Sequence, residues 1–199
     1  MKAIIHIFLY AVLMGHAAPS VGQKTALLLI DIQEFYFPGG RMQLENPEQA
    51  GMNAGLVLEQ FRNREYPVYH VRHNFEPGGN IHPYVRPLEG EKVFPKDQVN
   101  AFLETGLLET LRADSIEALV LCGMQTHMCL EAAVRAAHDL GFDCTVVQDA
   151  CATRALQYGE LIIPARNVHF STICTIEGSY AKVITTAALL KDFDQIILP

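Results

Sequence analysis

The sequence lacks the features that mark several large classes of protein. It contains no internal repeat or low-complexity run, and no basic patch in which Arg and Lys alternate with aromatic residues. Its 15 basic residues are outnumbered by 22 acidic ones, for a formal net charge of −7, so nucleic acid is not an expected partner. The 199 residues, 50% of them hydrophobic, suffice for one compact domain. We expect its partners to be a small-molecule substrate and other copies of the chain.

The N-terminal residues lack a hydrophobic run long enough to cross a bilayer comfortably, but they have a pattern of their own. Lys2 gives a short positive start, Ile4 to Met14 is a nearly continuous apolar run, and small residues follow. This outline is typical of a secretory signal peptide over residues 1–17, with an uncleaved anchor as the alternative. The sequence therefore predicts an exported protein, periplasmic or secreted, whose single domain spans residues 18–199 without a stable membrane span.

Cysteine pairs with the C-x-x-C spacing of zinc ribbons or dithiol redox sites are also missing. The chain has five cysteines, so at least one thiol must stay unpaired within it even in an oxidising compartment. A chain of this size does not need disulfides for stability. We expect four of the cysteines to be unpaired structural residues: Cys122, Cys144, Cys151 and Cys174.

What the sequence does contain is an alternation of apolar, strand-like runs with helical patterns. Strands are expected at residues 24–31, 67–71, 116–122, 142–148 and 180–186, and helices at 47–64, 105–112, 126–140, 159–167 and 187–191. The Pro- and Gly-rich residues 72–95 are expected to form a long irregular segment. This order predicts a three-layer α/β/α fold with a mostly parallel, Rossmann-like sheet of five or six strands. In such sheets, ligands bind at the carboxyl ends of the strands.

The stretch GMQTHMCLEAAVRAA, which begins at Gly123, places a cysteine at the start of an amphipathic helix. The buried stripe of this helix is expected to contain Leu130, Ala133, Val134, Ala137 and Leu140. Cys129 falls in the first turn, where free N–H groups and the helix dipole favour an anion, so the cysteine could be held as a thiolate near neutral pH. The same pattern also fits a small buried core residue.

The carboxyl-end rule brings a second group to this cysteine. Asp31 ends the first strand, and if that strand neighbours the one before Gly123, then Asp31 and Cys129 share one crevice. A cysteine needs a proton acceptor or a nearby cation to react quickly. Asp31 could accept the proton, and a lysine could hold both charges in place.

Five motifs lie between about Lys24 and the C-terminus: LLLIDIQ, PVYHVRH, VFPKDQVNAF, LVLCGMQTHMCLEAAVRAAHDLGF and TVVQDACATRA. Through these motifs the chain resembles the isochorismatase-like cysteine hydrolases, which include nicotinamidases and related amidases. The resemblance implies a triad of Asp31, Lys96 and the nucleophile Cys129. It also implies a cis peptide from Met124 to Gln125, and an oxyanion hole formed by the backbone N–H groups of Gln125 and Cys129. The activity it implies is hydrolysis of an amide-type bond through a thioester, by a homo-oligomer.

Several side chains near these motifs have two interpretations. Aromatic residues are expected to line the substrate pocket or simply to pack: Phe35, Tyr36, Phe37 and Phe94. His127 could contact substrate or lie at the surface, and Thr126 is expected to cap the helix. Asp149 is expected to accept backbone hydrogen bonds that hold its loop. Asp31 as a turn cap and Lys96 as a solvated lysine are the structural alternatives to catalysis.

The chain departs from the nicotinamidases in the region that holds their metal. Those enzymes carry Asp-x-His and a further His there, whereas this chain has His70, His73 and His82 without the aspartate. We therefore expect no metal and no organic cofactor. Without that metal site, nicotinamide is a less favoured substrate. Two alternatives to an amidase stay open: an isochorismatase-type vinyl-ether hydrolase with Asp31 as acid, and an inactive binding or assembly module of the same fold.

Overall fold

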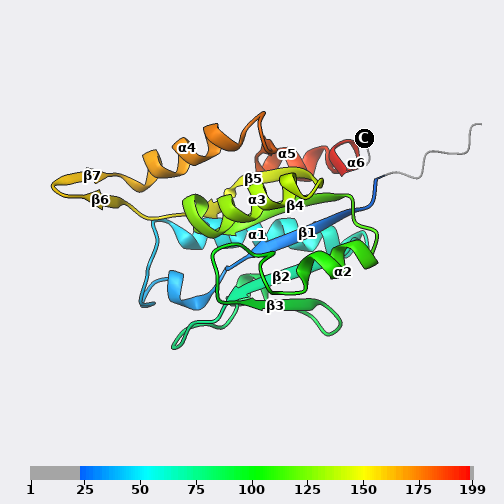
Figure 1. Ribbon diagram of the computed structural model, residues 1–199, viewed down its shortest axis with the longest axis horizontal. Coiled ribbons are helices and arrows are strands. Elements are labelled where there is room, and N and C mark those ends of the chain that lie inside the picture. The colour runs from blue at the N-terminus through cyan, green and yellow to red at the C-terminus, as the bar shows by residue number, and fades with distance from the viewer. Residues whose placement is uncertain (1–22, 198–199) are drawn as a thin grey trace, which may run out of the picture.

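The computed structural model describes residues 23–197 and contains a six-stranded sheet in the order β3-β2-β1-β4-β5-β8 (Figure 1). The strands of this sheet are β1 (Thr25–Ile30), β2 (Val68–His73), β3 (Lys92–Lys96), β4 (Ala118–Met124), β5 (Asp143–Ala152) and β8 (Lys182–Ile184). All of its strand pairs are parallel. The expected α/β fold with a parallel sheet is confirmed. The expected signal peptide, residues 1–17, lies outside the described residues.

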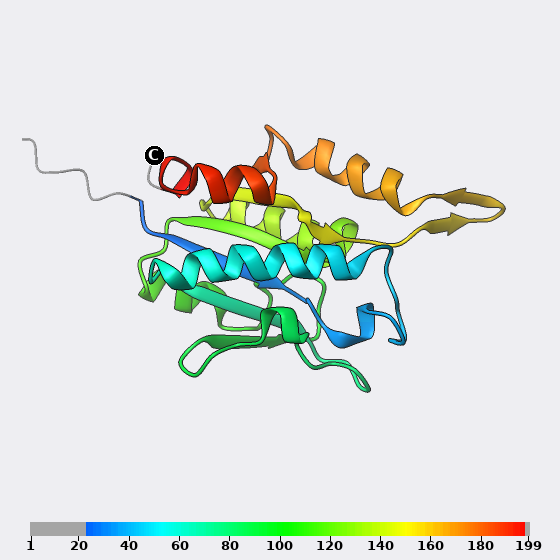
Figure 2. The same ribbon diagram turned by 180° about the vertical axis from the view of Figure 1, so that it is seen from behind.

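Helices cover both faces of the sheet. They are α1 (Pro47–Asn63), α2 (Leu107–Ala113), α3 (Glu131–Asp139), α4 (Ala165–Ile176), α5 (Thr186–Lys191) and α6 (Phe193–Ile197), with short turns η1 (Glu34–Tyr36), η2 (Pro83–Val85) and η3 (Thr126–Leu130). Figures 1 and 2 show α2 and α3 on one face and α1, α5 and α6 on the other. Among residues 23–197, no helix combines the length and hydrophobicity that crossing a membrane requires.

The central strand β1 explains why the sheet forms as it does. All six of its residues, TALLLI, are buried, as expected for a parallel strand covered on both faces. It pairs with β2 on one side and with β4 on the other, so that Ile30 stands beside Gly123. The ends of β1 and β4 are therefore neighbours at the carboxyl edge of the sheet, which meets the condition for Asp31 and Cys129 to share one crevice.

An arm projects from this carboxyl edge. It consists of a hairpin, β6 (Leu156–Tyr158) with β7 (Leu161–Ile163), followed by α4, and both views show it extending beyond the body of the fold (Figures 1 and 2). The hairpin exposes three apolar side chains: Tyr158, Leu161 and Ile162. The helix predicted over residues 159–167 is therefore wrong, because LQYGELII forms a hairpin and the helix begins only after Pro164.

The prediction of an irregular segment over residues 72–95 is also wrong in part. The second strand continues to His73, and residues 92–96 form β3, which pairs with β2 at the edge of the sheet. An edge strand tolerates Pro95, because proline's missing N–H costs nothing on the side that has no partner strand. Phe94 and Lys96 alternate inward along β3, a pattern that the surrounding Pro and Gly residues masked.

Candidate active site

Asp31 follows β1 in a left-handed backbone conformation, with φ of 49°. Few residues other than glycine adopt this conformation readily, and aspartate is among the more tolerant. The turn takes the chain out of the strand and leaves the carboxylate fully buried. Beyond an ion pair with Lys96, neither carboxylate oxygen accepts a well-aligned hydrogen bond from the described residues. The lone pairs of Asp31 therefore remain available to accept a proton.

Gly123 lets the end of β4 approach Asp31 closely. Its φ is 144°, and a Cβ at this position would lie 2.0 Å from the carbonyl oxygen of Ile30. Only glycine fits there. The sequence analysis expected the strand to end at Gly123, but β4 continues to Met124. The peptide from Met124 to Gln125 is cis, which confirms what the resemblance implied.

The nucleophile candidate lies in the π-helical turn η3, not in regular α-helix. The carbonyl of Gln125 accepts hydrogen bonds from Met128 N at 3.0 Å and Leu130 N at 3.3 Å, but not from the intervening N–H of Cys129. Thr126 is not the helix cap, because the turn begins after Gln125 and the Thr126 hydroxyl instead contacts His169 Nδ1 at 3.0 Å.

The side chain of Lys96 joins the acid to the sulfur. Lys96 is the last residue of β3 and is 1% exposed, an unusual setting for a lysine. Its Nζ lies 2.8 Å from Asp31 Oδ2 and donates to Cys129 Sγ at 3.2 Å. It also donates to the carbonyl of Gln98 at 3.0 Å. The structure thus brings together Asp31, Lys96 and Cys129, the residues named from the sequence.

The resting charge state of Cys129 depends on its burial and its charged neighbours. Burial raises the pKa of Cys129 to about 12; the negative charge of Asp31 adds to this, and Lys96 opposes it. Burial also raises the pKa of Asp31, while the charge of Lys96 lowers it. This direction opposes the thiolate that the helix start would allow, because burial and the adjacent carboxylate outweigh the charge of Lys96. The site therefore favours a thiol at rest.

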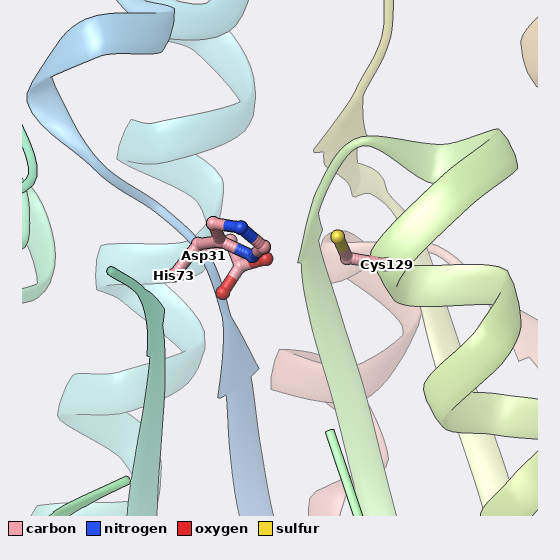
Figure 3. A group of neighbouring side chains, drawn as sticks. All are labelled: Asp31, His73 and Cys129. Carbon is pink, nitrogen blue, oxygen red and sulfur yellow. The ribbon is translucent and has the colours of Figure 1, made fainter. Parts of the chain in front are cut away.

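His73 is the third side chain around the ammonium. Figure 3 shows Asp31 and His73 at the ends of neighbouring strands, with the sulfur of Cys129 on the facing helical turn. One ligand atom from each of these residues lies within 4.8 Å of the others, which resembles a zinc ligand set. However, Lys96 Nζ contacts all three, with His73 Nδ1 at 3.0 Å. The ammonium thus already occupies the position that a metal cation would take.

The other histidines from the nicotinamidase comparison have separate partners. His70 is buried against Glu91, with Nε2 2.9 Å from Oε2, and Glu91 is also held by Arg62. His82 stacks on Phe37 at a centroid distance of 3.6 Å. These two histidines therefore do not converge with His73 on a common ligand.

The predicted substrate-contact residues lie in different settings. Phe35 lies within the turn η1 and Phe37 directly follows it, and both are buried. Phe94 packs near Tyr69, with 6.3 Å between ring centroids. As substrate contacts, Phe35, Phe37, Phe94 and His127 stay predictions. Asp149 accepts backbone and hydroxyl hydrogen bonds from Thr186, at the start of α5, so it fastens that helix to β5.

The sequence analysis missed a ring of polar contacts around the cysteine turn. Tyr36 lies at the site, because its hydroxyl accepts from Gln125 Nε2 at 3.4 Å. Arg154 Nε donates to Gln125 Oε1 at 3.3 Å. His127 contacts the Thr153 hydroxyl, and its pKa is lowered by burial and then by the charge of Arg154. The TVVQDACATR motif contained the signal, because it continues from β5 to the edge where β4 ends.

Two cavities lie outside the triad. One, of about 690 Å³, lies at the amino ends of the strands, near Thr25, Ala118 and Asp143. The other, of about 260 Å³, lies near the cysteine turn and is lined by residues that include Thr153 and His169. The side chains of Asp31, Lys96 and Cys129 are themselves enclosed, with Cys129 6% exposed.

Comparisons with known proteins identify one family. The family model for the isochorismatase domain matches residues 25–187. The isochorismatase family protein YddQ of Bacillus subtilis is 47% identical over 178 residues, covering 84% of this chain and 99% of its own. Maleamate amidohydrolase of Pseudomonas putida is 25% identical over 189 residues, covering 82% and 84%.

A solved structure shares the fold almost from end to end. An isochorismatase hydrolase of Oleispira antarctica superposes with a TM-score of 0.81 and 40% identity, covering 85% of this chain and 97% of its own. The family model thus matches most of the sequence, and the parallel sheet is shared with a solved relative. The chain belongs to the isochorismatase family of hydrolases.

Proposed function

We propose that this hydrolase cleaves a carbon–nitrogen, amide-type bond of a small molecule through a covalent thioester on Cys129. The observation that carries the proposal is the buried cluster in which Lys96 Nζ lies 2.8 Å from Asp31 and 3.2 Å from Cys129 Sγ. A proton acceptor, a cation and a sulfur nucleophile in mutual contact are the parts that covalent acyl transfer requires.

In the acylation step, Asp31 takes the thiol proton as the sulfur attacks the amide carbonyl. The otherwise unengaged oxygens of Asp31 suit it to this role. Lys96 stabilises the negative charge as it moves from the carboxylate to the sulfur. The backbone N–H groups of Gln125 and Cys129 are the proposed donors to the tetrahedral oxyanion. The π-helical turn supports this assignment, because the carbonyl of Gln125 leaves the N–H of Cys129 unbonded to it.

In the second half of the reaction, the carbon–nitrogen bond breaks and Asp31 returns its proton to the leaving amine. A thioester then links the acyl group to Cys129. Asp31 accepts a proton from water as the water oxygen attacks the thioester carbonyl. Collapse of this second tetrahedral species releases the carboxylic acid, and the proton on Asp31 returns to the sulfur. The side chain of Cys129 is thereby regenerated as a thiol.

The similarity to maleamate amidohydrolase supports an amide-type bond. A vinyl-ether hydrolase is the second candidate, in which Asp31 would protonate the substrate and the thiol would be dispensable. An inactive assembly module is the third. The proposed assembly of this hydrolase is a homo-oligomer, for which the exposed apolar hairpin is the available surface.

The Cys129→Ala variant separates these functions. Wild type and variant are assayed for acid release from a panel of small amides that includes maleamate, and for cleavage of isochorismate. Amide turnover lost with Cys129→Ala, together with an acyl adduct by intact-mass measurement on the wild type, is the expected result. Turnover that survives the substitution would rule out the thioester route. Wild-type protein inert on both substrate classes would favour the assembly module.

A further inference from the structure

His73 is placed beside Lys96 by the pairing of the sheet itself. The two residues are register partners in the parallel pair of β2 and β3, so their side chains project to the same face. His73 Nδ1 lies 3.0 Å from Lys96 Nζ. An ammonium has only donors, so Nδ1 must be the unprotonated ring nitrogen. The imidazole in this arrangement is therefore neutral, with its proton on Nε2.

The ammonium has fewer protons than the acceptors around it. Within 3.2 Å of Lys96 Nζ lie Asp31 Oδ2, His73 Nδ1, Gln98 O and Cys129 Sγ. An ammonium carries three N–H bonds. The hydrogen bonds of this ammonium go to His73 Nδ1, Gln98 O and Cys129 Sγ, while Asp31 pairs with it by charge. The bonds to His73 and Gln98 therefore fix the direction of the third N–H, which points at the sulfur.

The backbone of His73 is held by Gln33, two residues beyond Asp31. The Gln33 side chain is fully buried, accepts from His73 N at 2.8 Å and donates to His73 O at 2.9 Å. The same amide nitrogen donates to Gly79 O at 2.7 Å. Such a bidentate clamp fixes the end of β2 relative to the end of β1. The position of the imidazole is thus set from the strand that supplies the acid.

We propose that His73 is a positioning residue whose neutral imidazole accepts a hydrogen bond from Lys96 and holds its ammonium between Asp31 and Cys129. The role rests on the proposed function, since it serves the step in which the sulfur loses its proton. By accepting one N–H of Lys96, the neutral nitrogen of His73 keeps another N–H directed at the sulfur as the thiolate forms. The imidazole neither attacks substrate nor transfers a proton.

The charges around His73 agree with a neutral ring. Its pKa is lowered by burial and next by the positive charge of Lys96, while Asp31 and Asp97 oppose that shift. The Cys129 sulfur, within 4.8 Å, is uncharged at rest. A protonated ring would place two cations 3.0 Å apart and would push the ammonium from its place.

The test compares His73→Leu with His73→Asn in the full chain. Asparagine can place an acceptor near the position of Nδ1, whereas leucine cannot. The first readout needs no substrate: the rate at which iodoacetamide alkylates Cys129, followed by peptide mass spectrometry, reports how well Lys96 stabilises the thiolate. We expect His73→Leu to slow alkylation about tenfold, and His73→Asn to stay within about threefold of wild type.

The second readout is turnover of whichever amide the wild type hydrolyses. We expect kcat to fall in the same order while KM changes little, because the bond acts on the sulfur and not on substrate binding. His138→Leu is the matched control, since His138 is exposed at the end of α3 and lines the cavity at the amino ends of the strands. Circular dichroism verifies that each variant is folded.

The outcomes separate this role from the proposed function. Wild-type alkylation rates in His73→Leu would overturn the positioning role, and so would a His73→Asn variant as impaired as His73→Leu. If the wild type hydrolyses no amide but alkylation still ranks asparagine above leucine, the proposed function fails and the role of His73 stands.

Discussion

Cys129 and Cys151 are both buried thiols near the carboxyl edge of the sheet, yet only Cys129 has the neighbours of a nucleophile. Burial raises the pKa of each to about 12. Cys151 donates to the carbonyl of Val147 at 3.2 Å, whereas Cys129 accepts from Lys96 and lies within 4.8 Å of Asp31. The resting pKa therefore does not distinguish the two thiols. What distinguishes Cys129 is that neighbouring groups can accept its proton and neutralise the charge of its thiolate.

The strongest test of this difference removes each thiol in turn. We expect Cys129→Ala to lower kcat by on the order of 10³-fold or more, because no other group can form the acyl intermediate. Cys151→Ala should keep turnover within about threefold, since that sulfur makes its hydrogen bonds with the backbone of Val147 and Gly123. Comparable losses in the two variants would show that the cysteines differ in packing alone.

The second test removes the positive charge of Lys96 beside the Cys129 sulfur. Lys96→Met is expected to lower kcat by about 10²-fold, because the thiolate and the oxyanion then form without a neutralising charge in a buried site. Lys92→Met is the matched control on the same strand, where Lys92 is exposed and pairs with Asp114 at 2.8 Å. Steady-state kinetics on a hydrolysed amide measure both variants, and equal effects would contradict the role of Lys96.

A third test uses pH to measure the resting state of Cys129. Because burial raises the pKa of this thiol, its thiolate fraction is small at neutral pH and increases about tenfold for each pH unit below the pKa. Alkylation by iodoacetamide should therefore accelerate without a plateau between about pH 6 and pH 9. A plateau near neutrality would restore the thiolate that the helix start would allow.

The smallest expected effect concerns two glycines with positive φ. An added Cβ at Gly123 would lie 2.0 Å from the Ile30 carbonyl oxygen, whereas at Gly141 it would meet nothing within 4 Å. Gly141→Ala should cost about 1 kcal/mol in free energy of unfolding, from the left-handed backbone alone. Gly123→Ala should cost about 3 kcal/mol or more, because backbone must move. Urea unfolding measures both, and equal losses would argue against a tight junction of β1 and β4.

The parts of the fold that the sequence predicts well are those with a uniform local signal. β1 is a continuous apolar run that ends in Asp31, and α1 begins at Pro47 with Glu48 in its first turn, so each boundary has a chemical marker. β3 lacks such a marker, because its burial alternates and it contains proline. The hairpin of the arm is short and exposed, so its apolar residues carried no periodicity that distinguishes strand from helix.

The site shows the same division between local and distant information. The glycine-to-cysteine turn is a local motif, and the carboxyl-end rule brings Asp31 toward it. The charge state of Cys129 was not predictable, because burial and the carboxylate depend on the assembled sheet. The contacts of His73 with Lys96 and Gln33 depend on the β2–β3 register, and the sequence analysis missed the third strand.

The two roots of the projecting arm are hydrogen-bonded to the turn that carries the sulfur. Thr153, just before the hairpin, contacts His127, and His169 of α4 contacts Thr126. Deleting the arm to obtain a smaller protein would therefore also remove hydrogen bonds that hold the turn bearing Cys129. A shortened variant needs new partners for His127 and Thr126.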